Sequence, residues 1–306
     1  MKIAISKFTP AGCLSCLIIL LILTVPQRAA GQAQTRSPAA PWLQSLEQLP
    51  EALRQNEAIL LDLQALAAGY GTAIQKVVAQ GPQRFSLVMA NGRLILYDDG
   101  QLKGPEEKLE RPDLEDMLAQ PYRPGPLSRP PRTDEDPGRI RVEAFFQAVY
   151  GATPAEVQAR LVPVPFLGTT VRFQGNNGAA AALGRVGVRL SRLLAQQPAW
   201  RAVILPLQGT YNYRPIAGTD RLSSHAWGIA IDLHRGFYWR WAKVLAPMEL
   251  LALQAAYPQE IVQAFEAEGF IWGGKWYHYD TMHFEYRPEL LAKARLVAGS
   301  RVSAGN

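Results

Sequence analysis

The sequence contains very little cysteine, and this limits the chemistry that it can carry. Its only two cysteines, Cys13 and Cys16, lie within the first 33 residues. If that segment is removed, disulfides, thiolate metal ligands and a thiol nucleophile are all excluded. Histidine is also scarce, with four residues in the whole chain. Any metal site must therefore be built from these few imidazoles and from carboxylates.

Several common active-site motifs are missing as well. The sequence contains no GxGxxG fingerprint, no GxxxxGK(S/T) phosphate loop, no GxSxG elbow and no HExxH helix. Each of these motifs supplies a specific backbone or side-chain geometry for nucleotide, serine-nucleophile or metal chemistry. Their absence argues against nucleotide-binding enzymes, serine hydrolases of that type and metalloproteases with both histidine ligands on one helix.

The N-terminus has the pattern of a secretory signal peptide. Lys2 and Lys7 precede an apolar run over residues 13–25, and small residues follow at 29–33. The run is shorter than the roughly 20 residues that span a bilayer. We therefore predict that residues 1–33 are a cleaved signal peptide, the alternative being a membrane anchor. The mature protein is then expected to be periplasmic or secreted, without stable membrane insertion.

The charge of the remaining chain is close to balanced. Without residues 1–33 it has 29 basic and 26 acidic residues, against 32 and 26 in the whole sequence. This small positive excess suits an anionic surface such as a cell wall and does not predict nucleic-acid binding. About 270 residues are enough to bury a core in one or two domains.

Periodicity divides the rest of the chain into two parts. Leucines at near-helical spacing predict helices from 41 to about 80, and Asn91-Gly92 between two apolar runs predicts a hairpin over 84–100. Six prolines in 121–139 favour an extended connector, the alternative being an ordered arm of a single domain. We predict an N-terminal helical and hairpin module (34–120), a proline-rich connector (121–139), a C-terminal catalytic domain (140–295) and a tail (296–306).

The second part combines several helices with few strands. This mixture predicts an α+β fold in which helices flank a small antiparallel sheet. Capping signals and apolar periodicity predict helices over 141–149, from Thr153, over 178–197 and over 258–268, and strands over 170–173, 202–205, 228–233 and 282–286.

Residues 223–232 (SSHAWGIAID) combine a histidine with a carboxylate. Gly228 permits a sharp bend, and on the strand that follows Ala230 and Asp232 share one face. The seven-residue separation of His225 and Asp232 suits a loop ligand that folds back over a strand ligand. A structural His–Asp hydrogen bond is the alternative.

Residues 280–286 (DTMHFEY) provide a second histidine among carboxylates. Their alternation predicts a strand that buries its apolar side chains and turns His283 and Glu285 to the other face. Asp280 reaches the same site only if the chain bends before Thr281. Together the two segments offer two imidazoles, a carboxylate ligand and a spare acid, the donor set of a catalytic zinc site. Zn²⁺ is therefore the predicted cofactor.

The patterns SxHxxGxAxD and (D/E)xxH resemble those of a zinc peptidase family. This family comprises the D-Ala-D-Ala dipeptidases and carboxypeptidases and the L-alanyl-D-glutamate endopeptidases of bacterial cell walls. Segments 209–219, 269–274 and 282–288 are similar to one subgroup of it, so the resemblance covers roughly residues 140–290. It implies a D-alanyl-D-alanine carboxypeptidase-like zinc peptidase domain over 140–295, whereas 34–120 resembles no domain.

The resemblance also implies roles for individual residues. The general base of the family falls on Asp280, where many members have the longer glutamate. An arginine that faces the scissile carbonyl or the substrate carboxylate falls on Arg214, and a serine that contacts substrate falls on Ser223. The zinc ligands of the family fall on His225, Asp232 and His283.

The sequence thus predicts a zinc metallopeptidase that hydrolyses peptidoglycan stem peptides at a D-amino-acid centre, as a carboxypeptidase or an endopeptidase. The alternative is a non-catalytic zinc protein that binds or regulates the cell wall, which the shorter acid at 280 leaves open. Glu285 either orients a ligand or is a surface acid. His278 either contacts substrate or packs, and His234 is expected at most to border the pocket.

Overall fold

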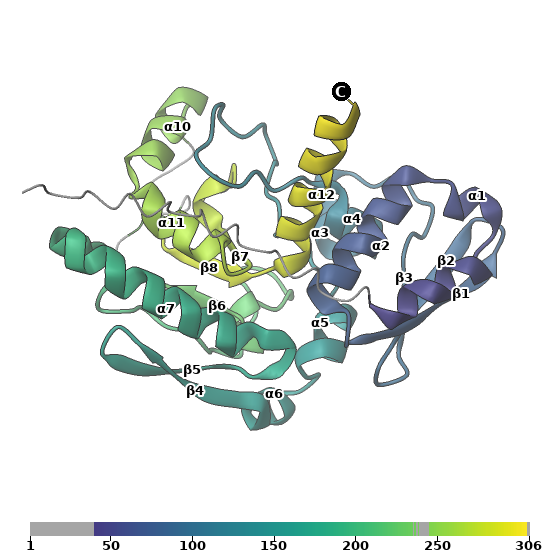
Figure 1. Ribbon diagram of the computed structural model, residues 1–306, viewed down its shortest axis with the longest axis horizontal. Coiled ribbons are helices and arrows are strands. Elements are labelled where there is room, and N and C mark those ends of the chain that lie inside the picture. Colours follow the sequence, from purple (N-terminus) through teal and green to yellow (C-terminus); the bar gives the residue numbers. More distant parts are fainter. Residues whose placement is uncertain (1–39, 235, 237, 239–244, 305–306) are drawn as a thin grey trace, which may run out of the picture. The chain divides into compact units, whose positions relative to one another are not determined.

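The computed structural model describes residues 40–234, 236, 238 and 245–304, so the predicted signal peptide lies outside the described residues. Within this part the fold is α+β, as predicted, with three small antiparallel sheets flanked by helices (Figure 1). No helix in these ranges is long and apolar enough to cross a membrane.

The N-terminal part places short helices against a three-stranded sheet. Asn56 caps the longest of these helices, because its side chain accepts the backbone N–H groups of Ala58 and Ile59. The predicted hairpin at Asn91-Gly92 is confirmed. The predicted helix is wrong beyond residue 70, since the β-branched residues that follow pair as a strand with the hairpin. The elements are η1 (Pro41–Gln48), α1 (Glu51–Arg54), α2 (Glu57–Tyr70), β1 (Ile74–Gly81), β2 (Arg84–Met89) and β3 (Leu94–Leu96).

Two helices, α3 (Pro105–Glu110) and α4 (Leu114–Ala119), lead into the proline-rich segment 121–139. This segment has no regular helix or strand but is held by hydrogen bonds to the C-terminal part. The Tyr122 hydroxyl donates to Glu266 at 2.6 Å, and Lys275 donates to the carbonyl of Gly125 at 2.6 Å. The division of the chain into separate domains stays a prediction.

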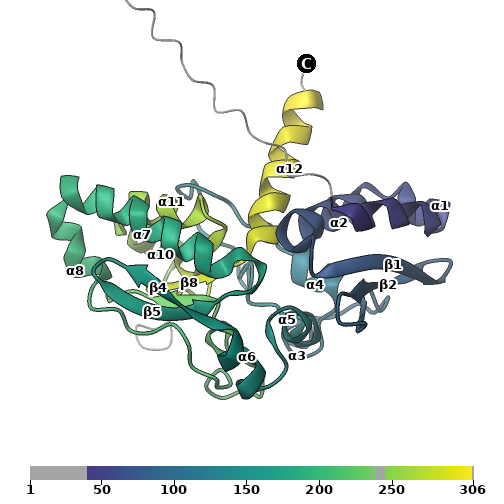
Figure 2. The same ribbon diagram turned by 60° about the horizontal axis from the view of Figure 1, so that its bottom comes forward.

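The second sheet is a hairpin of β4 (Leu161–Phe166) and β5 (Thr169–Gln174). Helix α7 (Ala179–Gln196) packs on it, and α5 (Glu143–Tyr150) and α6 (Pro154–Arg160) precede it (Figure 2). The sequence did not predict β4, because Pro163 and Pro165 lack the N–H of a central strand. Both prolines are accommodated because β4 pairs on one side only.

The strand predicted at 202–205 is wrong. The chain forms a 3₁₀ turn, η3 (Pro198–Trp200), followed by the short helix α8 (Arg201–Ile204). Proline at the first position of η3 fixes a φ angle that suits a helix. The apolar run at 202–205 is too short for its periodicity to distinguish a helix from a strand. Only Ile204 of α8 is fully buried.

The third sheet has the order β6-β8-β7, formed by β6 (Ala230–Asp232), β7 (Phe270–Trp272) and β8 (His283–Tyr286). In the antiparallel register Asp232 lies opposite His283 and Ile231 lies opposite Phe284. Opposed residues share a face, so the polar pair points one way and the apolar pair the other. Phe284 stacks on Phe265 with ring centroids 4.0 Å apart. Burial of that apolar face therefore fixes the register that presents Asp232 and His283.

Three further helices complete the C-terminal part. Phe265 belongs to α11 (Gln259–Glu266), which follows α10 (Pro247–Ala256). The last helix, α12 (Pro288–Ala304), packs against α2 of the N-terminal part, as both ribbon views show (Figures 1 and 2). Helix α12 includes residues 296–304, which belong to the predicted tail.

Candidate active site

The three predicted metal ligands lie together at one end of the third sheet. His225 belongs to the 3₁₀ helix η4 (Ser224–Trp227), which begins after Ser223 and ends at Gly228. Gly228 has φ +68°, and a Cβ there would lie 2.5 Å from a methyl group of Leu161. This turn carries the chain from His225 into β6 and Asp232, which is the bend that the sequence predicts.

The Asp232 carboxylate lies between the two imidazoles. Its Oδ2 is 3.2 Å from His225 Nε2, and its Oδ1 is 2.9 Å from His283 Nδ1. One donor atom from each of the three residues lies within 4.8 Å of the other two. The three side chains therefore face a common point and could hold a metal ion.

The second nitrogen of each imidazole is held by another partner. His225 Nδ1 is 2.7 Å from the carbonyl oxygen of Thr210, and His283 Nε2 is 3.1 Å from Glu285 Oε2. Metal-binding histidines usually donate their other N–H to such a carbonyl or carboxylate, which fixes the ring orientation and the tautomer. The nitrogens left to bind a metal are then His225 Nε2 and His283 Nδ1, the two that face Asp232.

Glu285 is a buried member of a charged network and not a surface acid. Its side chain is fully buried and contacts Arg141 at 2.5 Å and Arg287 at 3.1 Å. Burial alone would raise the pKa of Glu285, but these guanidinium groups and His283 hold it well below its usual range. The carboxylate is therefore charged and fixed when it accepts from His283.

The electrostatics of the cluster favour a positive charge at its centre. Burial would lower the pKa of His283, but its hydrogen bonds with the Asp232 and Glu285 carboxylates raise it to about 10. The pKa of Asp232 is lowered by the two histidines in spite of its burial. A divalent cation could replace the proton of His283, because metal binding requires neutral imidazole. Two imidazoles and one carboxylate fit Zn²⁺ with a coordination position left open.

Asp280 lines the same cavity, which has a volume of about 450 Å³, as the three candidate ligands. Its carbonyl accepts the His283 N–H at 3.2 Å, so the chain turns at Thr281 and Met282, whereas the sequence predicted a bend before Thr281. The side-chain Oδ1 is buried without a hydrogen-bond partner among the described residues. Burial, with the added repulsion of Asp232, raises the pKa of Asp280 to about 6. Asp280 is thus suited to accept and return a proton.

The remaining predicted residues divide between the cavity and its surroundings. Arg214 and Ser223 line the cavity, and the Ser223 N–H donates to the Arg214 carbonyl at 3.1 Å. His278 also lines it, with Nδ1 2.6 Å from Asp136. His234 contacts Gln208 instead and is not among the lining residues.

Two arginines of the cavity wall, Arg139 and Arg141, were missed by sequence reasoning. Arg139 ends the proline-rich segment and Arg141 follows it, about 140 positions before the last candidate ligand. The sequence carries no local signal for their position, since arginines near prolines are common in solvent-exposed connectors. Among the tryptophans near the cluster, Trp276 lines the cavity, whereas Trp227 and Trp272 are buried in the core.

A second acidic cluster near α4 contains its own cation. The ammonium group of Lys103 lies 2.8 Å from Asp99, 2.9 Å from Asp113 and 2.7 Å from Asp116. Lys103 is buried, and these carboxylates raise its pKa although burial acts to lower it. The ammonium group of Lys103 therefore occupies the place that a metal ion would take in this cluster.

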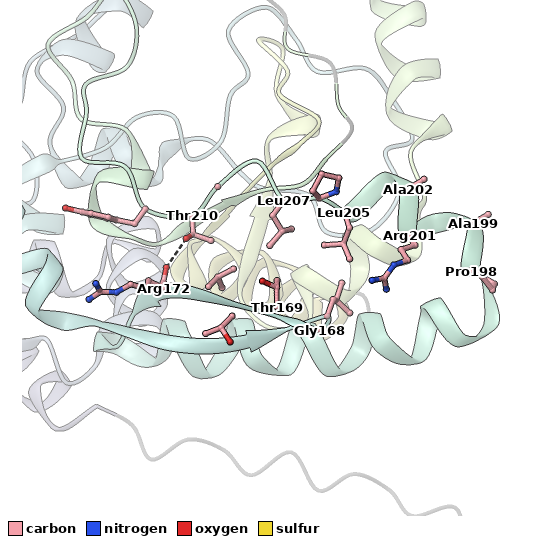
Figure 3. Close-up of a pocket in the computed structure, with 16 residues that line it drawn as sticks. Gly168, Thr169, Arg172, Pro198, Ala199, Arg201, Ala202, Leu205, Leu207 and Thr210 are labelled. Atoms are coloured by element: carbon pink, nitrogen blue, oxygen red, sulfur yellow. Dashed lines mark hydrogen bonds between the residues drawn. The ribbon is translucent and has the colours of Figure 1, made fainter.

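A larger cavity of about 1,120 Å³ lies between the β4–β5 hairpin and residues 198–211 (Figure 3). Among the described residues that line it there is no histidine, aspartate or glutamate. It adjoins the metal cluster through Thr210, whose hydroxyl donates to the Arg172 carbonyl at 2.9 Å (Figure 3). The groups capable of acid–base or metal chemistry are in the smaller cavity.

Replacing Glu285 by glutamine is expected to weaken metal binding by about 10- to 100-fold, because His283 loses its carboxylate partner. It should also lower the free energy of unfolding by about 3–5 kcal/mol, since Arg141 and Arg287 lose their buried counter-charge. Metal competition with a chromogenic chelator and urea unfolding measure the two effects.

Glu268→Gln is the matched control for this prediction. Glu268 also pairs with two arginines, Arg185 at 2.5 Å and Arg189 at 2.6 Å, but both arginines are at least half exposed. It should change stability by about 1 kcal/mol or less and leave metal affinity unchanged. Equal metal affinity in both variants would contradict the role given to Glu285.

Comparison with known proteins identifies one match. Residues 217–286 match the family model described as D-alanyl-D-alanine carboxypeptidase. The matched segment contains the three strands of the third sheet, the three candidate ligands and Asp280, and it supports a peptidase of this general type. No curated protein and no solved structure is significantly similar to the chain.

Proposed function

We propose that the protein is a zinc-dependent peptidase that hydrolyses peptide bonds in peptidoglycan stem peptides, at a D-amino-acid centre. One observation carries the proposal: the His225–Asp232–His283 cluster shares a cavity with a buried carboxyl group, Asp280, whose Oδ1 lacks a partner among the described residues. The match to a carboxypeptidase family model supports the same chemistry.

His225 Nε2, His283 Nδ1 and an Asp232 oxygen would hold the zinc ion. When bound, zinc supplies a Lewis acid that lowers the pKa of a water molecule and polarises a carbonyl group. Thr210 and Glu285 hold the two imidazole rings in the orientation that this requires.

The protein side chains supply the proton transfers and part of the charge stabilisation. Asp280 accepts a proton from the attacking water at its free oxygen and returns it to the leaving amine. Arg214 stabilises the negative charge that develops on the scissile carbonyl oxygen, because a cation that lines a partly closed cavity acts more strongly than one in open water. Ser223 contacts the substrate backbone beside His225.

The proposed partner is peptidoglycan, and the proposed location is the periplasm or the cell exterior. A predicted signal peptide, a mature chain without cysteine and a small positive charge agree with such a substrate and location. Nucleic acid is not proposed as a partner, because the charge excess is too small for a binding patch.

The test is incubation of the mature protein and zinc with purified muropeptides, followed by mass spectrometry. We expect products shortened at a D-amino acid, which disappear when the metal is chelated. Binding to the wall without any product would instead favour the non-catalytic zinc protein. Loss of one terminal residue indicates a carboxypeptidase, and separation of cross-linked peptides indicates an endopeptidase.

A further inference from the structure

One wall of the catalytic cavity comes from outside the segment that matches the carboxypeptidase family. Arg139 lies at the end of the proline-rich segment, yet it lines the cavity together with the candidate ligands. Its guanidinium group lies over the ring of Trp276, 5.8 Å from the ring centroid. The Trp276 ring in turn lies 5.6 Å, centroid to centroid, from the imidazole of His283.

The chain segment that leads to Arg139 is held by hydrogen bonds to residues 276–278. Asp136 accepts the backbone N–H of His278 at 2.8 Å, and its other oxygen contacts the imidazole at 2.6 Å. The Pro137 carbonyl accepts the indole N–H of Trp276 at 2.8 Å. These contacts tie the backbone on the N-terminal side of Arg139 to the cavity wall, so its position is built into the fold.

Arg139 and Arg141 differ in how closely their guanidinium groups are paired with carboxylates. Arg141 is buried and bound to Glu285 at 2.5 Å. Arg139 keeps 13% of its side chain exposed, and its nearest ion-pair contact in the described structure is Asp136 at 3.8 Å, the outer limit for such a pair. The acids that line the cavity are Asp232, which is a candidate metal ligand, and Asp280, which is the candidate base. Arg139 is therefore able to bind an anionic group of a ligand.

The two available arginines lie next to different ligands. Arg214 is linked to His225 through Ser223, which bonds to both backbones. Arg139 is linked to His283 through Trp276. Both arginines line the cavity that holds the cluster, so the two can serve different parts of a substrate bound there.

We propose that Arg139 binds the terminal carboxylate of the substrate and makes the enzyme selective for peptides with a free C-terminus. This inference rests on the proposed peptidase function and assigns it to the carboxypeptidase class. Only one residue separates the scissile carbonyl from a terminal carboxylate in such a substrate, so both groups must enter one cavity. A cavity of about 450 Å³ is of the size that encloses small ligands.

The test compares two peptides and four proteins. The peptides end in D-Ala-D-Ala, one as the free acid and one as the isosteric amide. The proteins are the wild type, R139Q, R139K and R192Q, the last being a matched control because Arg192 is exposed on α7 and does not line the cavity. Zinc-loaded proteins are assayed for kcat and KM on both peptides.

We expect the wild type and R192Q to prefer the acid over the amide by about 10- to 100-fold in kcat/KM, mainly through KM, since a charge-assisted bond is lost in the amide. R139Q should lose this preference by losing activity on the acid alone, and R139K should restore part of it. An equal loss on both peptides, or a wild type that does not distinguish them, would overturn the inference.

A binding experiment separates this inference from the proposed function. Calorimetric titration of both peptides into zinc-loaded D280N, with and without R139Q, measures recognition without turnover. Tighter binding of the acid that R139Q abolishes supports the role of Arg139 even if the wild type hydrolyses neither peptide, a result that would overturn only the peptidase. Equal binding of acid and amide overturns the role of Arg139 whatever the activity.

Discussion

Asp280→Asn is expected to lower kcat on muropeptides by about 10²- to 10⁴-fold, the usual contribution of a positioned proton acceptor. Asparagine preserves the shape of the side chain but cannot take up a proton. The reason to expect a large effect is structural: Oδ1 of Asp280 is buried and free of partners among the described residues, and burial raises the pKa of Asp280 to about 6.

Zinc content should not change in this variant, because Asp280 is not one of the three residues with converging donor atoms. Steady-state hydrolysis and metal analysis of the same sample measure the two outcomes. Asp220→Asn is the matched control, since Asp220 is exposed, lies in the family-matched segment and does not line the cavity. Full activity of the Asp280 variant would remove it as the base and favour a non-catalytic zinc protein.

Much of the candidate site could be predicted because its determinants are local. Strand alternation places Asp232 and His283 on the polar face of their strands, and the observed register joins those two faces. The sequence also indicated a bend next to Asp280, although the turn lies at Thr281 and Met282 and not before Thr281. Glycine at 228 similarly marked the bend after His225. In each case a few neighbouring residues determine the direction of a side chain.

The parts that could not be predicted depend on contacts between distant segments. Arg139 and Arg141 reach the cavity only because the preceding chain bonds to residues 276–278. The strand that contains Pro163 and Pro165 forms because β5 is available to pair with it. Neither arrangement produces a periodic pattern in the sequence, because each depends on a partner segment that lies elsewhere in the chain.

A network of buried charges extends from Glu285, the partner of the candidate ligand His283, to the first turn of α12. Arg287 contacts Glu285, Glu289 and the carbonyl of Gly138, the last at 2.7 Å. Glu289 lies in the first turn of α12 beside α2, where a Cβ on Gly69 would be 2.8 Å from its backbone nitrogen. Arg287, which pairs with the Glu285 carboxylate, is therefore itself held by the proline-rich segment and by α12.

His283→Ala is expected to abolish stoichiometric zinc binding and, with it, hydrolysis. The variant removes one of three donors and also separates Glu285 from the site, so the loss of affinity should exceed the about 10- to 100-fold cost of removing an outer partner alone. Metal analysis after dialysis should give one zinc per chain for the wild type and none for the variant. Thermal unfolding with and without zinc should show a metal-dependent increase in Tm only in the wild type.

The control is His234→Ala, because His234 contacts Gln208 and lies outside the cluster. It should retain zinc and activity. Zinc retained by His283→Ala would show that the ligand set is wrong. A wild type that binds no zinc would mean that the cluster is a hydrogen-bonded structural element, in which the carboxylates of Asp232 and Glu285 are neutralised by a protonated His283. The pKa of His283 is raised to about 10 without a metal ion, and this allows a metal site to be distinguished from a structural element. Zinc binding must displace that proton, so the zinc affinity of a true metal site falls as the pH is lowered, whereas a structural element takes up no zinc at any pH.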